Sequence, residues 1–180
     1  MKKILCLVLC IIFALSLTSC GKNLRGKSKH SVDVEYYAKL GQISNLQYKL
    51  GDSIEDAKIA LSKTEDDHGE SNYFEYESGE YTVMTDGIAC CCYKTDDKDS
   101  GITHIVKYGD AYGFNIGAVS TQVRDIMSEM GFDATEREAK SGELFFLPAS
   151  AGTTVLEYQI KENTVLFVFQ EHALSATVIY

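Results

Sequence analysis

The sequence has few basic residues outside its first 31 positions. From Val32 onward, acidic residues outnumber basic ones by more than two to one, and the whole chain has a formal net charge of -9. Because binding to phosphates needs a positively charged surface, this balance argues against nucleic acid as a partner. The chain also shows no Ser-His-Asp or Gly-x-Ser-x-Gly arrangement and no phosphate-binding loop. We therefore predict no catalytic residues and no cofactor.

The six cysteines lack the pattern of a disulfide framework. Cys6 and Cys10 fall in an N-terminal apolar run, Cys20 follows that run, and the other three occupy positions 90–92. On a strand, Cys90 and Cys92 share one face while the cysteine between them points to the other. We interpret the three as small buried apolar residues. A strained disulfide, a metal site completed by a second segment, and a nucleophilic thiol are the alternatives.

The apolar run at residues 4–17 is too short to cross a bilayer as a helix and has the length of a signal-peptide core. Two lysines precede it, and Leu-Thr-Ser leads into Cys20. This arrangement resembles a bacterial lipoprotein signal, in which the peptide is cut before the cysteine and the thiol carries a diacylglyceryl group. The resemblance implies a signal peptide over 1–19, lipid attachment at Cys20, export, and anchoring to the outer surface of the cell membrane, or to an outer membrane if the host has one.

Residues 20–47 are predicted to comprise the lipidated cysteine and a linker or N-terminal arm. Within it, residues 21–30 carry basic side chains and no acidic one. Such a tether is attracted to an anionic membrane by about 1 kcal/mol per Lys or Arg near the surface, although a polar linker with incidental charge fits as well. Residues 33–40 form either a short helix ended by Gly41 or an extended arm.

Helix and strand patterns follow one another twice from Tyr48 onward. Asp52 or Ser53 can cap a helix that ends near Lys63, and the second helix is expected over 120–130. Asp86-Gly87 is a strong signal for a tight hairpin. Strands are expected at 73–77, 81–85, 88–94, 102–108, 143–147, 153–160, 164–170 and 174–180. The predicted fold class is therefore α+β, with two helix-plus-four-strand antiparallel units, 48–110 and 111–180, forming one tandem-repeat domain.

Short motifs precede both predicted helices. Leu50-Gly51-Asp52-Ser53 opens the first, and Ile116-Gly117 opens the second, which then departs from the pattern with Ala118-Val119-Ser120. With the lipid signal, this arrangement resembles the β-lactamase-inhibitory-protein fold and the small lipoproteins of outer-membrane assembly, of the SmpA and OmlA class. The resemblance implies a protein-binding role without catalysis.

Aromatic residues lie mostly on the predicted strands and include eleven tyrosines and eight phenylalanines, with no tryptophan. If helices cover one face of the sheet, the other face stays partly open. We expect a face that mixes tyrosines and carboxylates, formed by Tyr73, Glu75, Glu77 and Tyr81, to bind an unidentified envelope protein. The alternative is that these tyrosines merely border the core.

Two acidic loops suggest a second class of function. Residues 65–70 surround His68, and residues 96–99 resemble part of a calcium-binding loop without its later glutamate. We interpret both as solvated loops and predict no metal ligands. A sensor of a small ligand or cation at the envelope is the alternative function that these loops support.

Overall fold

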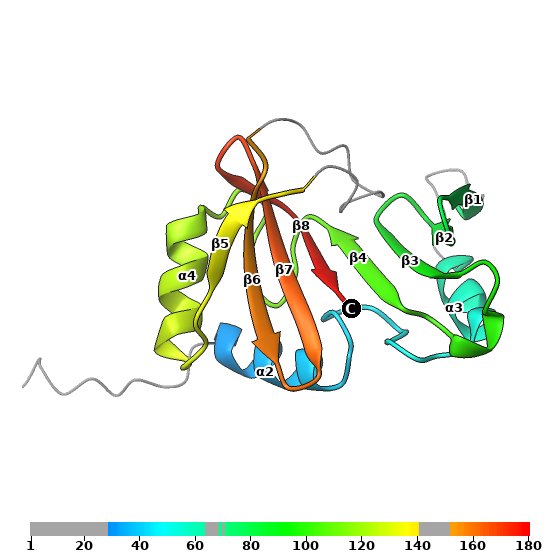
Figure 1. The fold of residues 1–180 in the computed structure, drawn as a ribbon, viewed down its shortest axis with the longest axis horizontal. Helices are drawn as coiled ribbons and strands as arrows, with labels where there is room; N and C mark the ends of the chain where they lie inside the picture. Colours follow the sequence, from blue (N-terminus) through cyan, green and yellow to red (C-terminus); the bar gives the residue numbers. More distant parts are fainter. Residues whose placement is uncertain (1–28, 64–68, 70, 141–151) are drawn as a thin grey trace, which may run out of the picture.

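The computed structural model describes residues 29–63, 69, 71–140 and 152–180 (Figure 1). The expected signal peptide, Cys20 and most of the basic tether lie outside the described residues. So do residues 65–68 and 70 of the first acidic loop, and the strand expected at 143–147. Within the described ranges, no helix has the length and apolar character needed to cross a membrane.

Eight strands form one antiparallel sheet in the order β1-β2-β3-β4-β8-β7-β6-β5 (Figure 1). At its centre β4 pairs with β8, with Val106 opposite Val178. Among the described strands, the two edges are therefore β1 and β5. The strands are β1 (Phe74–Ser78), β2 (Tyr81–Thr85), β3 (Ala89–Lys94), β4 (His104–Tyr108), β5 (Thr135–Glu138), β6 (Thr154–Ile160), β7 (Asn163–Gln170) and β8 (Ala173–Ile179).

The predicted fold class, two helix-plus-four-strand units, is wrong. The structure is dominated by a single eight-stranded sheet, and the described helices are three short ones: α2 (Lys29–Lys39), α3 (Ile54–Leu61) and α4 (Ser120–Glu129). Backbone pairing between β4 and β8 makes the strands of the two expected units parts of one continuous sheet. Helix α2, which the pattern assigned to no unit, also packs on β6 and β7. The periodicity of side chains could not show where the sheet would continue.

The tight turn between β2 and β3 follows directly from its sequence. Gly87 has a φ of 83°, which a residue without a Cβ adopts readily. The Asp86 carboxylate accepts the backbone N–H of Ile88 at 2.9 Å and that of Ala89 at 2.8 Å. These bonds place β3 beside β2, with Met84 opposite Cys91.

All three helices lie against the same face of the sheet and share one hydrophobic core with it. Ser53 begins α3 by accepting the Asp56 backbone N–H, as its capping pattern predicts. The buried residues of the helices are Val34 and Ala38 of α2, Ala57 and Leu61 of α3, and Val123 and Met127 of α4. They join Met84, Cys91, Ile105, Leu156 and Phe167 of the sheet in a single cluster.

The opposite face of the sheet, which we call the helix-free face, carries a second buried cluster. Its members come from β2, β3, β4, β6, β7 and β8, and the cluster includes no helical residue. Val83, Val106 and Val178 lie along it, and Tyr81 and Tyr108 pack at its side. Strands buried on both faces explain why β7 is a nearly continuous apolar run rather than an alternating one.

The structure decides between two alternatives for one element and adds another that was not expected. Residues 33–40 were compatible with a helix or an extended arm, and the structure has the helix, beginning at Lys29. Strand β5 was not predicted, because its sequence, Thr-Glu-Arg-Glu, carries no apolar residue. It forms by pairing with β6, where Arg137 lies opposite Val155.

Candidate binding surface

The four candidate residues from the sequence do not share one face. Glu75 and Glu77 lie on the helix-covered side of β1, since they pair with Met84 and Thr82 of β2. Tyr73 directly precedes β1 and donates a hydrogen bond from its hydroxyl to Glu75. Tyr81, in contrast, lies on the helix-free face. The structure therefore brings the first three together and separates the fourth from them.

Glu75 connects the edge strand to α3. Its carboxylate lies 2.8 Å from Lys58 Nζ, with both side chains about one-third exposed. Hydrogen bonds from Lys58 and Tyr73 hold the pKa of Glu75 below its ordinary value, and the bond to Glu75 raises the pKa of Lys58. Burial, with the hydrogen bond to Glu75, raises the pKa of Tyr73. The carboxylate is therefore ionised and held in place at neutral pH.

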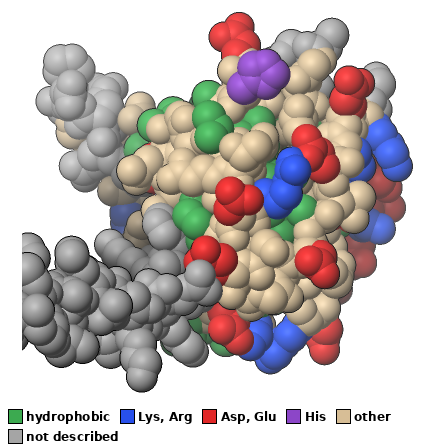
Figure 2. Space-filling model, turned by 90° about the vertical axis from the view of Figure 1, so that its left-hand side faces the viewer, with side chains coloured by type: hydrophobic (Ala, Val, Ile, Leu, Met, Phe, Trp, Pro, Cys, Tyr) green, Lys and Arg blue, Asp and Glu red, His purple; other side chains and the backbone are tan. Residues whose placement is uncertain are grey.

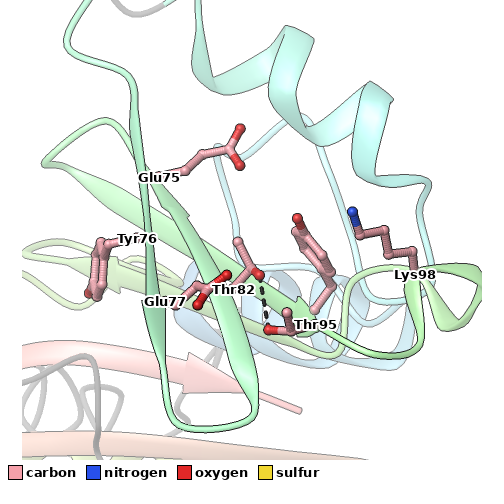
Figure 3. A pocket seen from close by; sticks show the side chains of 7 residues that line it. Glu75, Tyr76, Glu77, Thr82, Thr95 and Lys98 are labelled. Atoms are coloured by element: carbon pink, nitrogen blue, oxygen red, sulfur yellow. Dashed lines mark hydrogen bonds between the residues drawn. The ribbon is translucent and has the colours of Figure 1, made fainter.

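A shallow groove runs beside these carboxylates, with a volume of about 330 Å³. We call it the acidic groove. In Figure 3 Glu75 points towards α3, whereas Tyr76 points away on the other side of β1. Hydroxyls of Thr82 and Thr95 lie 3.0 Å apart within the groove. Its lining residues are Glu75, Tyr76, Glu77, Thr82, Tyr93, Thr95 and Lys98.

The helix-free face carries aromatic rings that the sequence-based set missed. Phe74 and Tyr76 stack on β1 with ring centroids 6.1 Å apart, and they are 53% and 38% exposed. His104 lies between Tyr81 and Tyr180, at centroid distances of 5.2 and 5.3 Å. We call the set the aromatic face; its members are Phe74, Tyr76, Tyr81, His104, Tyr108 and Tyr180.

His104 is neutral at physiological pH. Burial lowers its pKa, because the charged imidazolium loses hydration there. The ring nitrogen Nδ1 lies 3.0 Å from the hydroxyl of Thr103. An uncharged ring between two tyrosines makes the middle of the aromatic face an apolar contact surface with polar tips, which is typical of protein interfaces.

The three cysteines are buried and free. Cys91 belongs to the core under the helices, while Cys90 and Cys92 belong to the cluster of the helix-free face, as strand alternation predicts. Burial raises the pKa of Cys90 to about 12 and also raises the pKa of both neighbours. Cys90 Sγ lies 3.8 Å from the Tyr108 hydroxyl. All three thiols are therefore protonated, and they act as packing residues rather than nucleophiles.

The second acidic loop contains a short 3₁₀ turn, η2 (Lys98–Ser100). Across the residues that the structure describes, no group of three His, Cys, Asp or Glu side chains is arranged to hold a metal ion. Acidic and basic side chains around α4 are interspersed with uncharged surface and form no continuous patch (Figure 2). The acidic groove and the aromatic face lie on opposite sides of β1.

No family model, curated protein or solved structure matches this chain. The interpretation of the surface therefore depends on its own residues and geometry. Sequence reasoning could place Phe74 and Tyr76 on one face of their strand, because alternation is visible in the sequence. It could not bring Tyr81, His104 and Tyr180 together, because they meet only through the pairing of β2 with β3, β3 with β4 and β4 with β8.

Proposed function

We propose that this chain is an exported, lipid-anchored protein that binds another protein of the cell envelope and performs no catalysis. The observation that carries the proposal is the aromatic face, where exposed Phe74, Tyr76 and Tyr180 accompany half-buried rings on β2 and β4. Tyrosine provides rigid contact area with a hydroxyl at its tip, and such residues dominate binding energy in protein interfaces.

The anchor part of the proposal depends on the N-terminal sequence. A diacylglyceryl group at Cys20 would hold the folded body at the membrane surface, since two acyl chains anchor a protein far more stably than one. Metabolic labelling with an alkyne analogue of palmitate tests this part. We expect label on the full chain and none on the Cys20→Ser variant; a labelled variant, or an unlabelled parent, would overturn it.

Site-specific photo-crosslinking in cells tests the binding part. A photoreactive phenylalanine analogue at position 76 or 180 is expected to form one discrete adduct with an envelope protein. The same analogue at Ile59, which is 47% exposed on α3, is the matched control and is expected to form none. The serine substitution Tyr81→Ser should weaken the adduct from position 180. Equal adducts from all three positions, or none from 76 and 180, would contradict the proposal.

A further inference from the structure

The two edge strands of the sheet differ in what they present to solvent. Strand β5 carries side chains that are engaged in ion pairs, Arg124 with Glu136 and Arg137 with Glu157. Strand β1 instead alternates aromatic and acidic residues, Phe-Glu-Tyr-Glu. Its first four residues are exposed, and of the two glutamates Glu75 pairs with Lys58 of α3. An edge strand presents unpaired backbone groups and can receive another strand. Of the two edges, β1 is the one that presents aromatic rings on one face and carboxylates on the other.

The outward backbone groups of β1 belong to its two glutamates. Thr95 N donates to Glu80 O, so residue 80 bonds towards β3. Consecutive residues of an antiparallel strand direct their backbone groups to opposite sides. Residues 82 and 84 therefore also bond towards β3, while residues 81, 83 and 85 bond towards β1, where their partners are Ser78, Tyr76 and Phe74. Glu75 and Glu77 consequently turn their N–H and C=O groups to the open edge.

A strand added at this edge would meet two chemically distinct surfaces. On the helix-covered side, alternate side chains would lie beside Glu75 and Glu77 and the acidic groove. On the helix-free side, the remaining side chains would lie beside the stacked rings of Phe74 and Tyr76. Opposite charges and aromatic or aliphatic contacts are the favourable cross-strand pairs. The complementary strand therefore alternates basic and apolar residues.

We propose that β1 binds an extended segment of an envelope protein as a ninth strand, and that this segment alternates lysine or arginine with apolar residues. This rests on the proposed protein-binding function and names the partner's chemistry. Main-chain hydrogen bonds to Glu75 and Glu77 provide affinity, and the alternating side chains provide specificity.

A second copy of this chain does not fit the edge. Antiparallel pairing of β1 with itself about Tyr76 places Glu75 of one copy opposite Glu77 of the other, on both sides of the centre. Parallel pairing in register places each glutamate opposite the same glutamate. Like charges directly opposite each other destabilise a strand pair. The acidic residues therefore act against self-association and favour a basic partner.

The probe for this proposal is a dye-labelled, end-blocked peptide of seven residues in which valine and lysine alternate. Its binding to the full chain, purified in a mild detergent, is measured by fluorescence anisotropy. A peptide of the same composition, with its valines and lysines in separate blocks, controls for simple charge attraction. We expect the alternating peptide to bind at least about tenfold more tightly, because only its side chains match both faces of β1.

Proline substitutions at the two edges separate strand addition from other binding. Glu77→Pro removes an N–H group that faces the open edge, so no hydrogen bond to β2 is lost. Proline is tolerated at such positions of edge strands. We expect it to weaken the alternating peptide by roughly tenfold or more, because a donor is lost and the ring obstructs the approach. Glu138→Pro is the matched control on β5. Ala139 N donates to Thr153 O on the side of β6, so the backbone N–H of residue 138 faces the open edge. This variant should leave peptide binding unchanged.

Charge reversal provides a test that does not depend on proline. Glu77→Lys should weaken the valine–lysine peptide about three- to tenfold and improve binding of a valine–glutamate peptide. Equal effects of Glu77→Pro and Glu138→Pro in folded proteins, or no preference for the alternating peptide, would overturn strand addition. If the crosslink from position 180 persists in such a case, binding through the aromatic face stands and only the β1 proposal is removed.

Discussion

Two buried tyrosines on the same core provide a sharp test of the packing described above. Tyr112 and Tyr158 are both fully buried, and both rings contact Phe167 edge to face, at centroid distances of 6.2 and 5.8 Å. The Tyr112 hydroxyl donates to Gln42 O at 2.8 Å. The Tyr158 hydroxyl has no hydrogen-bond partner among the described residues. The substitutions Tyr112→Phe and Tyr158→Phe therefore remove chemically identical atoms with opposite consequences.

The expected magnitudes follow from the cost of an unsatisfied buried group. A buried polar group without a partner costs about 1–3 kcal/mol of stability, whereas a satisfied hydrogen bond contributes a net stabilisation of about 0.5–1.5 kcal/mol. Tyr158→Phe should raise the free energy of unfolding by about 1 kcal/mol. Tyr112→Phe should lower it by about 1–2 kcal/mol, because Gln42 also loses its partner. The two variants should thus differ by roughly 2–3 kcal/mol.

Urea unfolding followed by circular dichroism measures both changes. The dependence of the unfolding free energy on urea should be the same for parent and variants, since the area exposed on unfolding hardly changes. In thermal unfolding, the same change of 1 kcal/mol would shift the midpoint temperature by about 2–4 °C for a chain of this size. If Tyr158→Phe loses as much stability as Tyr112→Phe, the Tyr158 hydroxyl has a partner and the reasoning is refuted.

Three further outcomes are expected. The pKa of His104 is lower in the folded chain than in the unfolded one, so the unfolded state binds more protons. The free energy of unfolding should therefore fall as the pH drops below about 6.5. His104→Gln should flatten this part of a plot of stability against pH, and an unchanged slope would contradict the lowered pKa. The thiols at positions 90–92 should resist a disulfide reagent at pH 8 and react at once in denaturant, whereas fast labelling of the folded chain would show exposure. Asp86→Ala should lower the unfolding free energy by about 2–4 kcal/mol, because two backbone N–H groups lose their acceptor. Asp96→Ala in the exposed loop is the control, and an equal loss of stability in the two variants would argue against the turn geometry.

Local sequence signals located most elements. The Asp86-Gly87 turn positioned β2 at residues 81–85, as observed, and apolar residues at helical spacing positioned α4. These signals are short-range, since a turn or a helical stripe depends on neighbours within a few residues. The same logic missed β5, because a polar edge strand is stabilised by its neighbour β6 and not by its own apolar residues.

The candidate surface shows the same division. Alternation alone separates Phe74 and Tyr76 from Glu75 and Glu77, so the two faces of β1 could be read from four consecutive residues. It could not show that Tyr81 lies on the aromatic side, or that Glu75 is paired with Lys58 of α3. Those relations depend on the register between β1 and β2 and on where α3 packs.

From the sequence alone, most strands, the α3 and α4 helices and the alternation of side chains along each strand could be inferred, because these properties are set by local backbone geometry. Three features became visible in the fold alone: β4 and β8 join all the described strands into one sheet, the helices cover one face of it, and β1 is left at an edge. Strand order is a long-range property: the hydrogen bonds of any two strands are chemically alike, and the choice between partners is made by the burial of the whole core.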